Sequence, residues 1–543
     1  MYEVDIVSER DAKEMPHVLL LAAHEPWRDP RLSWIAAGGR DGFIIHQLGI
    51  SRVANDNPSE SGSDDIGWVW SYPPMETSRN LGVIREYIFS RGNSAALLEL
   101  SSLIAIMSLD DSELLAVLGG ADPYRRVKFY WSVKYLLQMT YSLVAHAEKM
   151  TGISAVIATD LDTLLAGIVL KERWGVPLIY DAHEFWPEAD VEQDSFELEF
   201  WVALEGRLAK YVDYAQTVSP GLAAHMARLY GIPFASVPNA EPLSSRVAQS
   251  EKEAGSAHTG SECRFLFQGG FAKARGIDLL IDAWPDTHPS AILVLRGPDN
   301  EYKEKMIDLA ITLGVYATRV KFLEAIDESD LVTAAVEFDV GLLPYTPTGL
   351  NYANCCPNKL SQYMAAGLPI LASRTSYVNQ IILESGAGAV IDFADRFQLI
   401  GEIDRFALDP ALRMGYAKKS ATYFLEQFHW EKVSRIFYAR LTDLIKKINI
   451  SSSGGLAYDG NLNVFPEIVV EEPPVVEEPP IVEEPPVVEE SPVVEESPVD
   501  EDPPAPVRSR LSEIAFRISR RLWILVPVGL RVRIRAELRH WIQ

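Results

Sequence analysis

The sequence has few cysteines and no long apolar run. Its three cysteines are Cys263, Cys355 and Cys356. Their number and spacing exclude a disulfide framework, fit a reducing compartment and match neither a zinc-binding nor a catalytic-thiol pattern. No stretch of about 18 apolar residues is present, so no transmembrane helix is expected. The first 15 residues are polar and lack the apolar core of a signal peptide, which predicts a cytoplasmic protein.

Basic residues are outnumbered by acidic ones, and no carboxylate cluster is placed to hold a metal ion against a diphosphate. The formal net charge is −26 at pH 7. An acidic protein repels nucleic acid, so no nucleic-acid partner is expected. Asp160 and Asp162 form a superficial Asp-x-Asp pair, but they precede an apolar helix rather than a nucleotide site. We therefore expect neither a metal ion nor another cofactor to be required.

Two successive series of short apolar strands alternate with helices, as in doubly wound parallel sheets. The first series has expected strands at 18–23, 43–47, 156–159, 178–180 and 215–218. The second has expected strands at 264–268, 292–296, 320–323, 340–343 and 370–372. The polar stretch 51–66 is expected to be a loop. The predicted fold is α/β, with two Rossmann-like domains that face each other across a cleft.

Composition divides the chain into domains and linkers. The first Rossmann-like domain is expected at 1–242 and the second at 263–429. The segment 243–262 between them is poor in apolar residues and is interpreted as a linker. A helix at 430–450 is expected to cross back to the first domain. The segment 451–506 contains the repeat V-V-E-E-P/S-P, which cannot bury a core and predicts a disordered linker.

The charge of the chain changes sign near its end. Residues 467–502 include 14 acids and no bases, whereas residues 503–543 include nine arginines and two glutamates. Within 507–543 the apolar residues recur at helical spacing beside the arginines. This pattern is typical of amphipathic helices that bind an anionic membrane surface, and a protein groove is the alternative partner.

The segment 357–373, PNKLSQYMAAGLPILAS, combines a helix and a buried strand. Pro357 suits a helix start, and Gly367 suits its end. Asn358 and Lys359 fall at the predicted helix N-terminus. Free N–H groups and the helix dipole favour negative charge there, which predicts a phosphate-bearing ligand.

This segment resembles the donor-binding signature of family 4 glycosyltransferases, which are retaining enzymes of the GT-B fold. Four further segments resemble motifs of that family in the same order: YDAHEFWPE (180–188), VSPGL (218–222), VPNA (237–240) and FQGGFAKAR (267–275). The resemblance extends over residues 16–448. It implies a nucleotide-diphosphate sugar as donor and a glycan, a lipid-linked molecule or a protein as acceptor.

The resemblance places the donor site in the second domain. Glycines after the first strand would let backbone N–H groups approach a phosphate. The family often has Arg where this chain has Gly270, and Lys where it has Arg275. Two glutamates of the family fall on Asn354 and Gln362, whose amides can hydrogen-bond but lack charge. The predicted donor residues are Gly269, Gly270, Lys273, Arg275, Arg296, Asn354, Asn358, Lys359 and Gln362.

The predicted catalytic residues are His183 and Arg275. His183 ends a strand at the expected cleft, and the matching histidine of related enzymes contacts the sugar or the reacting centre. The loop after the first strand is where the family places acceptor contacts. The predicted acceptor-side residues are His24, Glu25, Arg28, Arg31 and Glu184.

The sequence thus predicts a cytoplasmic, hexosyltransferase-type enzyme on the inner face of a bacterial cell membrane, active in polysaccharide biosynthesis. Two alternatives remain open. The two amides and the missing arginine are compatible with an inactive GT-B module that binds nucleotide or partners. A nucleotide-sugar epimerase has the same fold. A phosphorylase is disfavoured because no lysine-centred pyridoxal phosphate site is recognisable.

Overall fold

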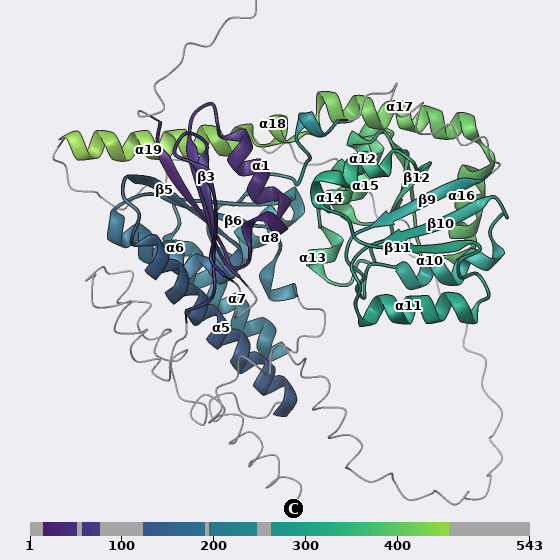
Figure 1. Cartoon of the computed structure of the whole chain (residues 1–543), viewed down its shortest axis with the longest axis horizontal. Helices are drawn as coiled ribbons and strands as arrows, with labels where there is room; N and C mark the ends of the chain where they lie inside the picture. The colour runs from purple at the N-terminus through teal and green to yellow at the C-terminus, as the bar shows by residue number, and fades with distance from the viewer. Residues whose placement is uncertain (1–14, 52–56, 76–122, 190–194, 247–261, 455–543) are drawn as a thin grey trace, which may run out of the picture. The chain divides into compact units, whose positions relative to one another are not determined.

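The computed structural model describes residues 15–51, 57–75, 123–189, 195–246 and 262–454. They lie within one compact unit, Met1–Leu456. They form two sheets with helices packed around them (Figure 1). The predicted α/β fold of two Rossmann-like domains is therefore confirmed. Most of the predicted linker at 451–506 and all of the predicted tail helices at 507–543 lie outside the described residues.

The first sheet has the strand order β3-β4-β2-β1-β5-β6-β7-β8. Its strands run parallel, except that β3 and β4 form an antiparallel hairpin. Apolar runs form the central strands because both faces of the sheet are covered. The strands are β1 His17–Ala22, β2 Ile44–Ile50, β3 Ser59–Ser63, β4 Gly67–Tyr72, β5 Ile153–Thr159, β6 Leu178–Ala182, β7 Tyr214–Thr217 and β8 Ala235–Ser236.

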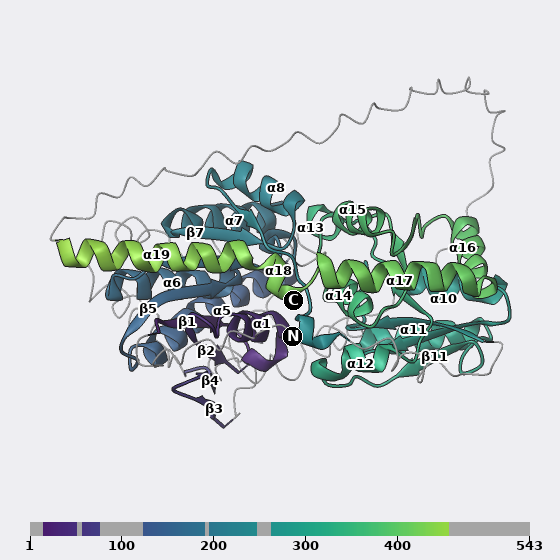
Figure 2. The same cartoon turned by 90° about the horizontal axis from the view of Figure 1, so that it is seen from above.

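Helices cover both faces of this sheet. Val18 and Leu20 of β1 pack with Ile35, Phe437 and Leu441, so the last long helix of the described chain lies on the first sheet (Figure 2). The intervening residues of β1 point to the opposite face. The helices are α1 Pro30–Gly38, α5 Pro123–Ala147, α6 Asp160–Trp174, α7 Ser195–Leu208, α8 Pro220–Tyr230, α18 Trp430–Val433 and α19 Arg435–Gly454.

The second sheet is parallel throughout, with the order β11-β10-β9-β12-β13-β14. Its core includes Phe265, Phe267 and Trp284. The strands are β9 Cys263–Gln268, β10 Ala291–Arg296, β11 Val320–Leu323, β12 Val340–Leu343, β13 Ile370–Ser373 and β14 Gly388–Ile391. The helices are α10 Ile277–Ala283, α11 Glu301–Thr312, α12 Leu331–Ala335, α13 Leu350–Ala353, α14 Asn358–Ala365, α15 Ser376–Ser385, α16 Arg396–Leu408 and α17 Pro410–Glu426.

The structure differs from the sequence expectation at several places, and β3, β4, β8 and β14 are additional to the ten expected strands. The stretch 51–66, expected to be a loop, contains the edge strand β3, which is mostly exposed and is held by pairing with β4. The last helix is not continuous, because α18 ends before Ser434 and α19 then runs to Gly454, into the start of the predicted linker. Within the described residues, no helix combines the length and the apolar character needed to cross a membrane.

Candidate functional site

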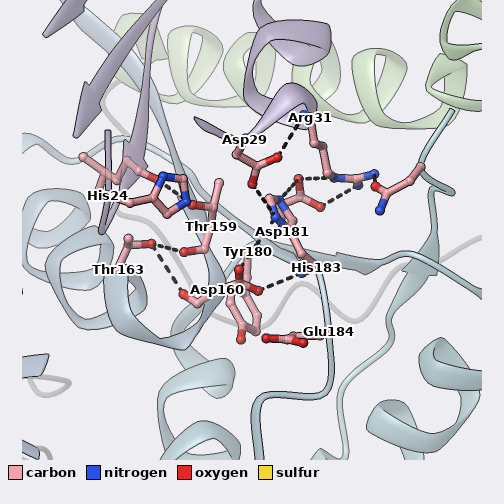
Figure 3. Close-up of polar contacts among 12 residues, drawn as sticks. His24, Asp29, Arg31, Thr159, Asp160, Thr163, Tyr180, Asp181, His183 and Glu184 are labelled. Atoms are coloured by element: carbon pink, nitrogen blue, oxygen red, sulfur yellow. Dashed lines mark hydrogen bonds and ion pairs between the residues drawn. The ribbon is translucent and has the colours of Figure 1, made fainter. Parts of the chain in front are cut away.

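His183 lies directly after β6 and is surrounded by the aspartate cluster, Asp29, Asp160 and Asp181 (Figure 3). The Nδ1 atom of His183 is 3.0 Å from Asp29 Oδ2 and 3.7 Å from Asp160 Oδ2. Its Nε2 atom is 3.3 Å from Asp181 Oδ2. Strands β1, β5 and β6 are parallel neighbours. Residues at or after their carboxyl ends therefore meet at one edge of the sheet, where ligands of α/β proteins bind.

Burial and charge together set the protonation of this cluster. Burial opposes a charged imidazole, but the carboxylates of Asp160, Asp29 and Asp181 outweigh it and raise the pKa of His183 well above its ordinary value. Burial also opposes charge on Asp181, yet Arg31 and His183 hold its pKa far below the usual range. The cluster therefore favours the imidazolium form of His183, in which both ring nitrogens donate hydrogen bonds.

Arg31 was predicted to lie on the side of the sugar acceptor. In the structure it binds Asp181. Its Nε and Nη2 atoms donate to the two carboxylate oxygens of Asp181 at 2.9 and 2.7 Å. Its Nη1 atom donates to the Val237 carbonyl and to Asn239 Oδ1. The side chain is 1% exposed. Because the guanidinium bonds protein groups with all three of its nitrogens, Arg31 fixes the position of Asp181 beside His183.

Asp160 begins α6 in a left-handed backbone conformation, with φ of 56°. This conformation is unfavourable for a non-glycine residue, by about 1–3 kcal/mol, and such strain concentrates at functional sites. Its Oδ1 atom accepts the backbone N–H of His183 at 2.8 Å. Burial raises the pKa of Asp160. The sequence reasoning missed Asp160 and Asp29 as members of this site, although each closely follows a predicted strand.

The other predicted acceptor-side residues have different surroundings. His24 and Glu184 are half-buried and lie beside the aspartate cluster (Figure 3). Burial raises the pKa of Glu184. Glu25 is buried, and its Oε2 atom is 3.3 Å from Nε of Arg28, whose side chain is 58% exposed. The structure therefore brings His24 and Glu184 to His183, whereas Glu25 and Arg28 pair with each other.

A second polar group lies in the second domain, where β9 ends. Gly269 has φ of 125°, which favours glycine, and an added β-carbon there would lie 2.7 Å from Lys359 Nζ. Arg275 Nη1 donates to the Gly270 carbonyl oxygen at 3.0 Å. Arg275 precedes α10 in sequence, and Lys359 lies in the first turn of α14. Two cations that are far apart in sequence thus converge on Gly269 and Gly270.

This cation pair, Arg275 and Lys359, makes no direct ion pair with a carboxylate of the described residues. Lys359 is 7% exposed, and its Nζ atom bonds Tyr345 OH at 3.0 Å. The Nε atom of Arg275 is buried without a hydrogen-bond partner. Burial and the Arg275 charge lower the pKa of Lys359 to about 7. Two neighbouring cations without a direct ion pair favour binding of an anion.

The remaining predicted donor residues belong to several elements of the second domain. Lys273 is exposed. Asn354 follows α13 and donates through Nδ2 to the Leu350 carbonyl at 3.0 Å. Asn358 begins α14, Arg296 ends β10, and Gln362 is buried on α14. Within the described ranges, no three His, Cys, Asp or Glu side chains are arranged to hold a metal ion.

Two family models match the chain, one in each domain. Residues 109–240 match the glycosyl transferase 4-like domain, and residues 262–409 match the glycosyl transferases group 1. The chain is 25% identical over 292 residues to D-inositol 3-phosphate glycosyltransferase from Acidothermus cellulolyticus. That match covers 49% of this chain and 61% of the relative, so the chain spans about three fifths of the relative's length.

Solved structures share the fold. Sucrose-phosphate synthase from Thermosynechococcus elongatus has a TM-score of 0.57 and 14% identity, over 80% of this chain and 100% of that one. HepE of Anabaena in complex with UDP-glucose has a TM-score of 0.52 and 14% identity, over 79% of this chain and 100% of that one. These structural similarities show the two-domain fold, and the two family models show the protein family. The chain belongs to the family 4-like glycosyltransferases of the GT-B fold.

Proposed function

We propose that this protein transfers a hexose from a nucleoside diphosphate sugar to a glycan, lipid-linked or protein acceptor, with retention of anomeric configuration. The observation that carries the proposal is the cation pair: the buried Lys359 and the half-buried Arg275 converge on Gly269 and Gly270 without an ion-paired carboxylate among the described residues. A diphosphate would supply the missing negative charge. Structures of HepE with UDP and with UDP-glucose support this class of donor.

The proposed reaction breaks the bond between the anomeric carbon and a donor phosphate oxygen. Negative charge then develops on the diphosphate, and the cation pair stabilises it. The free N–H groups at the start of α14 add a second source of positive potential. The acceptor oxygen bonds the anomeric carbon on the face that the diphosphate leaves, and the acceptor proton passes to the departing phosphate oxygen.

His183 is proposed to orient the transferred sugar. Its side chain is 14% exposed, and its two ring nitrogens lie within ion-pair distance of Asp29 and Asp181. The aspartate cluster favours the charged imidazolium, and a charged donor forms strong hydrogen bonds. A sugar hydroxyl would share such a donor with the carboxylates.

A panel of nucleotide sugars tests this proposal. Full-length protein is incubated with UDP-, GDP- and ADP-sugars, binding is followed by saturation-transfer NMR, and release of nucleoside diphosphate is quantified. Transfer or slow donor hydrolysis supports the proposed activity. Binding without turnover would instead favour an inactive nucleotide-binding module, and a changed donor sugar would favour an epimerase. Failure to bind any donor would contradict the diphosphate site.

Turnover is expected to persist in EDTA. The cation pair and the start of α14 can neutralise the leaving diphosphate without a metal ion. Initial rates are measured for protein treated with EDTA and for the same protein after magnesium or manganese is added back. Complete loss of activity that either metal restores would refute metal-independent transfer.

Donor affinity is expected to fall as the pH rises from about 7 to about 9, by up to about tenfold per pH unit. The pKa of Lys359 is lowered to about 7, so the free protein loses this positive charge in that range. A bound diphosphate favours the protonated ammonium, and affinity is therefore higher at the lower pH. Calorimetric titration with UDP measures the profile. Lys359→Arg keeps its charge and should flatten the profile, whereas a flat wild-type profile would contradict the prediction.

Deletion of residues 507–543 is expected to release the protein from anionic membranes without unfolding it. We propose that this segment holds the enzyme at the inner face of the cell membrane, with each arginine contributing about 1 kcal/mol near an anionic surface. The segment lies outside the described residues, and the described sheets do not include it. Vesicle flotation compares the full chain, this deletion and a control deletion of 467–502. Equal flotation of all three would favour docking of the tail on a protein.

A further inference from the structure

A polar relay, Arg296, Gln268, Gln362 and Glu328, lies beside the cation pair. Arg296 Nη1 is 3.4 Å from Gln268 Oε1. Gln268 Nε2 donates to Gln362 Oε1 at 3.0 Å, and Gln362 Nε2 donates to Glu328 Oε1 at 2.9 Å. Arg296, Gln268 and Gln362 are buried, whereas Glu328, in the turn Glu328–Asp330, is exposed. The relay therefore leads from a buried cation to a carboxylate at the protein surface.

The two ends of the relay fix the orientation of both amides. Each amide oxygen accepts from the side of Arg296, and each NH2 group donates toward Glu328. Turning Gln362 over would place its NH2 against that of Gln268 and its oxygen against a carboxylate. The sequence predicted that Gln362 binds the donor. In the structure its amide instead bonds protein partners, so it is poorly placed to bind the donor directly.

Neighbouring carboxylates explain why an amide stands at position 362. Glu241 is buried and lies within hydrogen-bonding reach of Gln362, and its backbone N–H bonds the hydroxyl of Ser361 at 3.0 Å. Burial raises the pKa of Glu241 to about 7, and Glu328 adds to that effect. A glutamate at 362 would place a third carboxylate between these two, at a large electrostatic cost. Gln362 can instead donate to both.

The position of Glu328 suits a donor whose diphosphate occupies the cation pair. Glu328 is near enough to Lys359 that each charge influences the pKa of the other. Its Oε1 atom is held by Gln362, while Oε2 makes no hydrogen bond within the described part of the chain. Burial raises the pKa of Glu328, whereas Lys359 and Gln362 favour its charged form. A pre-oriented and exposed carboxylate accepts hydrogen bonds from hydroxyl groups. In a nucleotide sugar, the ribose hydroxyls are adjacent to the diphosphate.

We propose that Glu328 binds the ribose hydroxyls of the donor and that Gln268 and Gln362 position its carboxylate. In this assignment, the negative charge that related enzymes carry at position 362 is displaced to the far end of the relay. The proposal rests on the proposed function, because it takes the cation pair as the diphosphate site. It adds Glu328 as a donor-binding residue and makes Gln362 a positioning residue.

Calorimetry on the full-length protein tests this assignment with three probes. They are the tightest-binding nucleoside diphosphate among UDP, GDP and ADP, its 2′,3′-dideoxy analogue, and inorganic pyrophosphate. Glu328→Gln is expected to weaken the nucleoside diphosphate about tenfold and to leave pyrophosphate unchanged. The wild-type preference for the ribose form over the dideoxy form should disappear in this variant.

Moving the charge back along the relay provides the decisive control. Gln362→Glu alone should also weaken the nucleoside diphosphate, because it crowds three carboxylates together. The exchange variant, Glu328→Gln with Gln362→Glu, should recover affinity to within about threefold of wild type. A merely structural role for Glu328 would not give this recovery. Thermal melting of each variant confirms that the fold is retained.

The possible outcomes separate the two proposals. An unchanged ribose preference in Glu328→Gln, or an equal loss for pyrophosphate and nucleotide, would overturn the assignment of Glu328 and leave the diphosphate site intact. Retention of pyrophosphate binding in Arg275→Ala would instead overturn the diphosphate site. If the wild-type protein binds none of the three probes, the proposed function and this assignment both fail.

Discussion

Replacing Arg31 with methionine is expected to destabilise the protein by about 3–5 kcal/mol. The Arg31 and Asp181 side chains are 1% and 0% exposed and meet through two parallel hydrogen bonds. Removing the guanidinium leaves the Asp181 carboxylate buried, with Gln216 and His183 as its remaining side-chain partners. The cost arises from this poorly compensated charge. Urea-induced unfolding, followed by tryptophan fluorescence, measures the shift of the transition.

Two variants show whether the unpaired charge is the cause. Arg40→Met removes an exposed arginine from the same part of the chain and is expected to change stability by less than about 0.5 kcal/mol. Adding Asp181→Asn to Arg31→Met should recover part of the lost stability, because the buried carboxylate is then neutral. Equal, small effects of Arg40→Met and Arg31→Met would show that the buried pair does not stabilise the fold.

The fold was predictable because most strands are apolar runs buried on both faces. The first strand was expected at 18–23 and lies at His17–Ala22. Strand β3 was not predictable, because its sequence SESGS is polar and only backbone pairing with β4 holds it. The break after α18 also left no signal in the apolar pattern. There, the Ser434 hydroxyl donates to the Trp430 carbonyl, a local bond that competes with the regular helix.

The candidate sites were only partly predictable. His183 could be selected because it follows a strand, but its charge depends on Asp29 and Asp160, which tertiary packing brings to it. The approach of Lys359 to Gly269 joins residues that are 90 positions apart in sequence. Glu328 lies in an exposed turn that matches none of the recognised motifs. Side-chain partnerships of this kind depend on the placement of whole elements, which apolar periodicity does not specify.

Replacing Arg275 with alanine is expected to slow sugar transfer about a hundredfold, equivalent to about 3 kcal/mol of lost transition-state stabilisation. Its guanidinium donates to the Gly270 carbonyl and still has a buried N–H group without a partner. Those remaining donors can form two parallel bonds to a phosphate. Lys273 is on the same loop, but it is exposed. Lys273→Ala is therefore expected to change the rate by less than about threefold.

Steady-state kinetics for both variants separates donor binding from chemistry. A contact that strengthens as the diphosphate leaves should lower kcat and kcat/KM together, whereas a contact made equally in the bound donor should raise KM alone. Arg275→Lys keeps the charge but loses the two-pronged geometry, so it should fall between wild type and Arg275→Ala. Near-wild-type rates for both Arg275→Ala and Lys273→Ala would show that other groups hold the diphosphate. Lys359 and the N–H groups at the start of α14 would then bind the diphosphate, because Lys359 also lies beside Gly269.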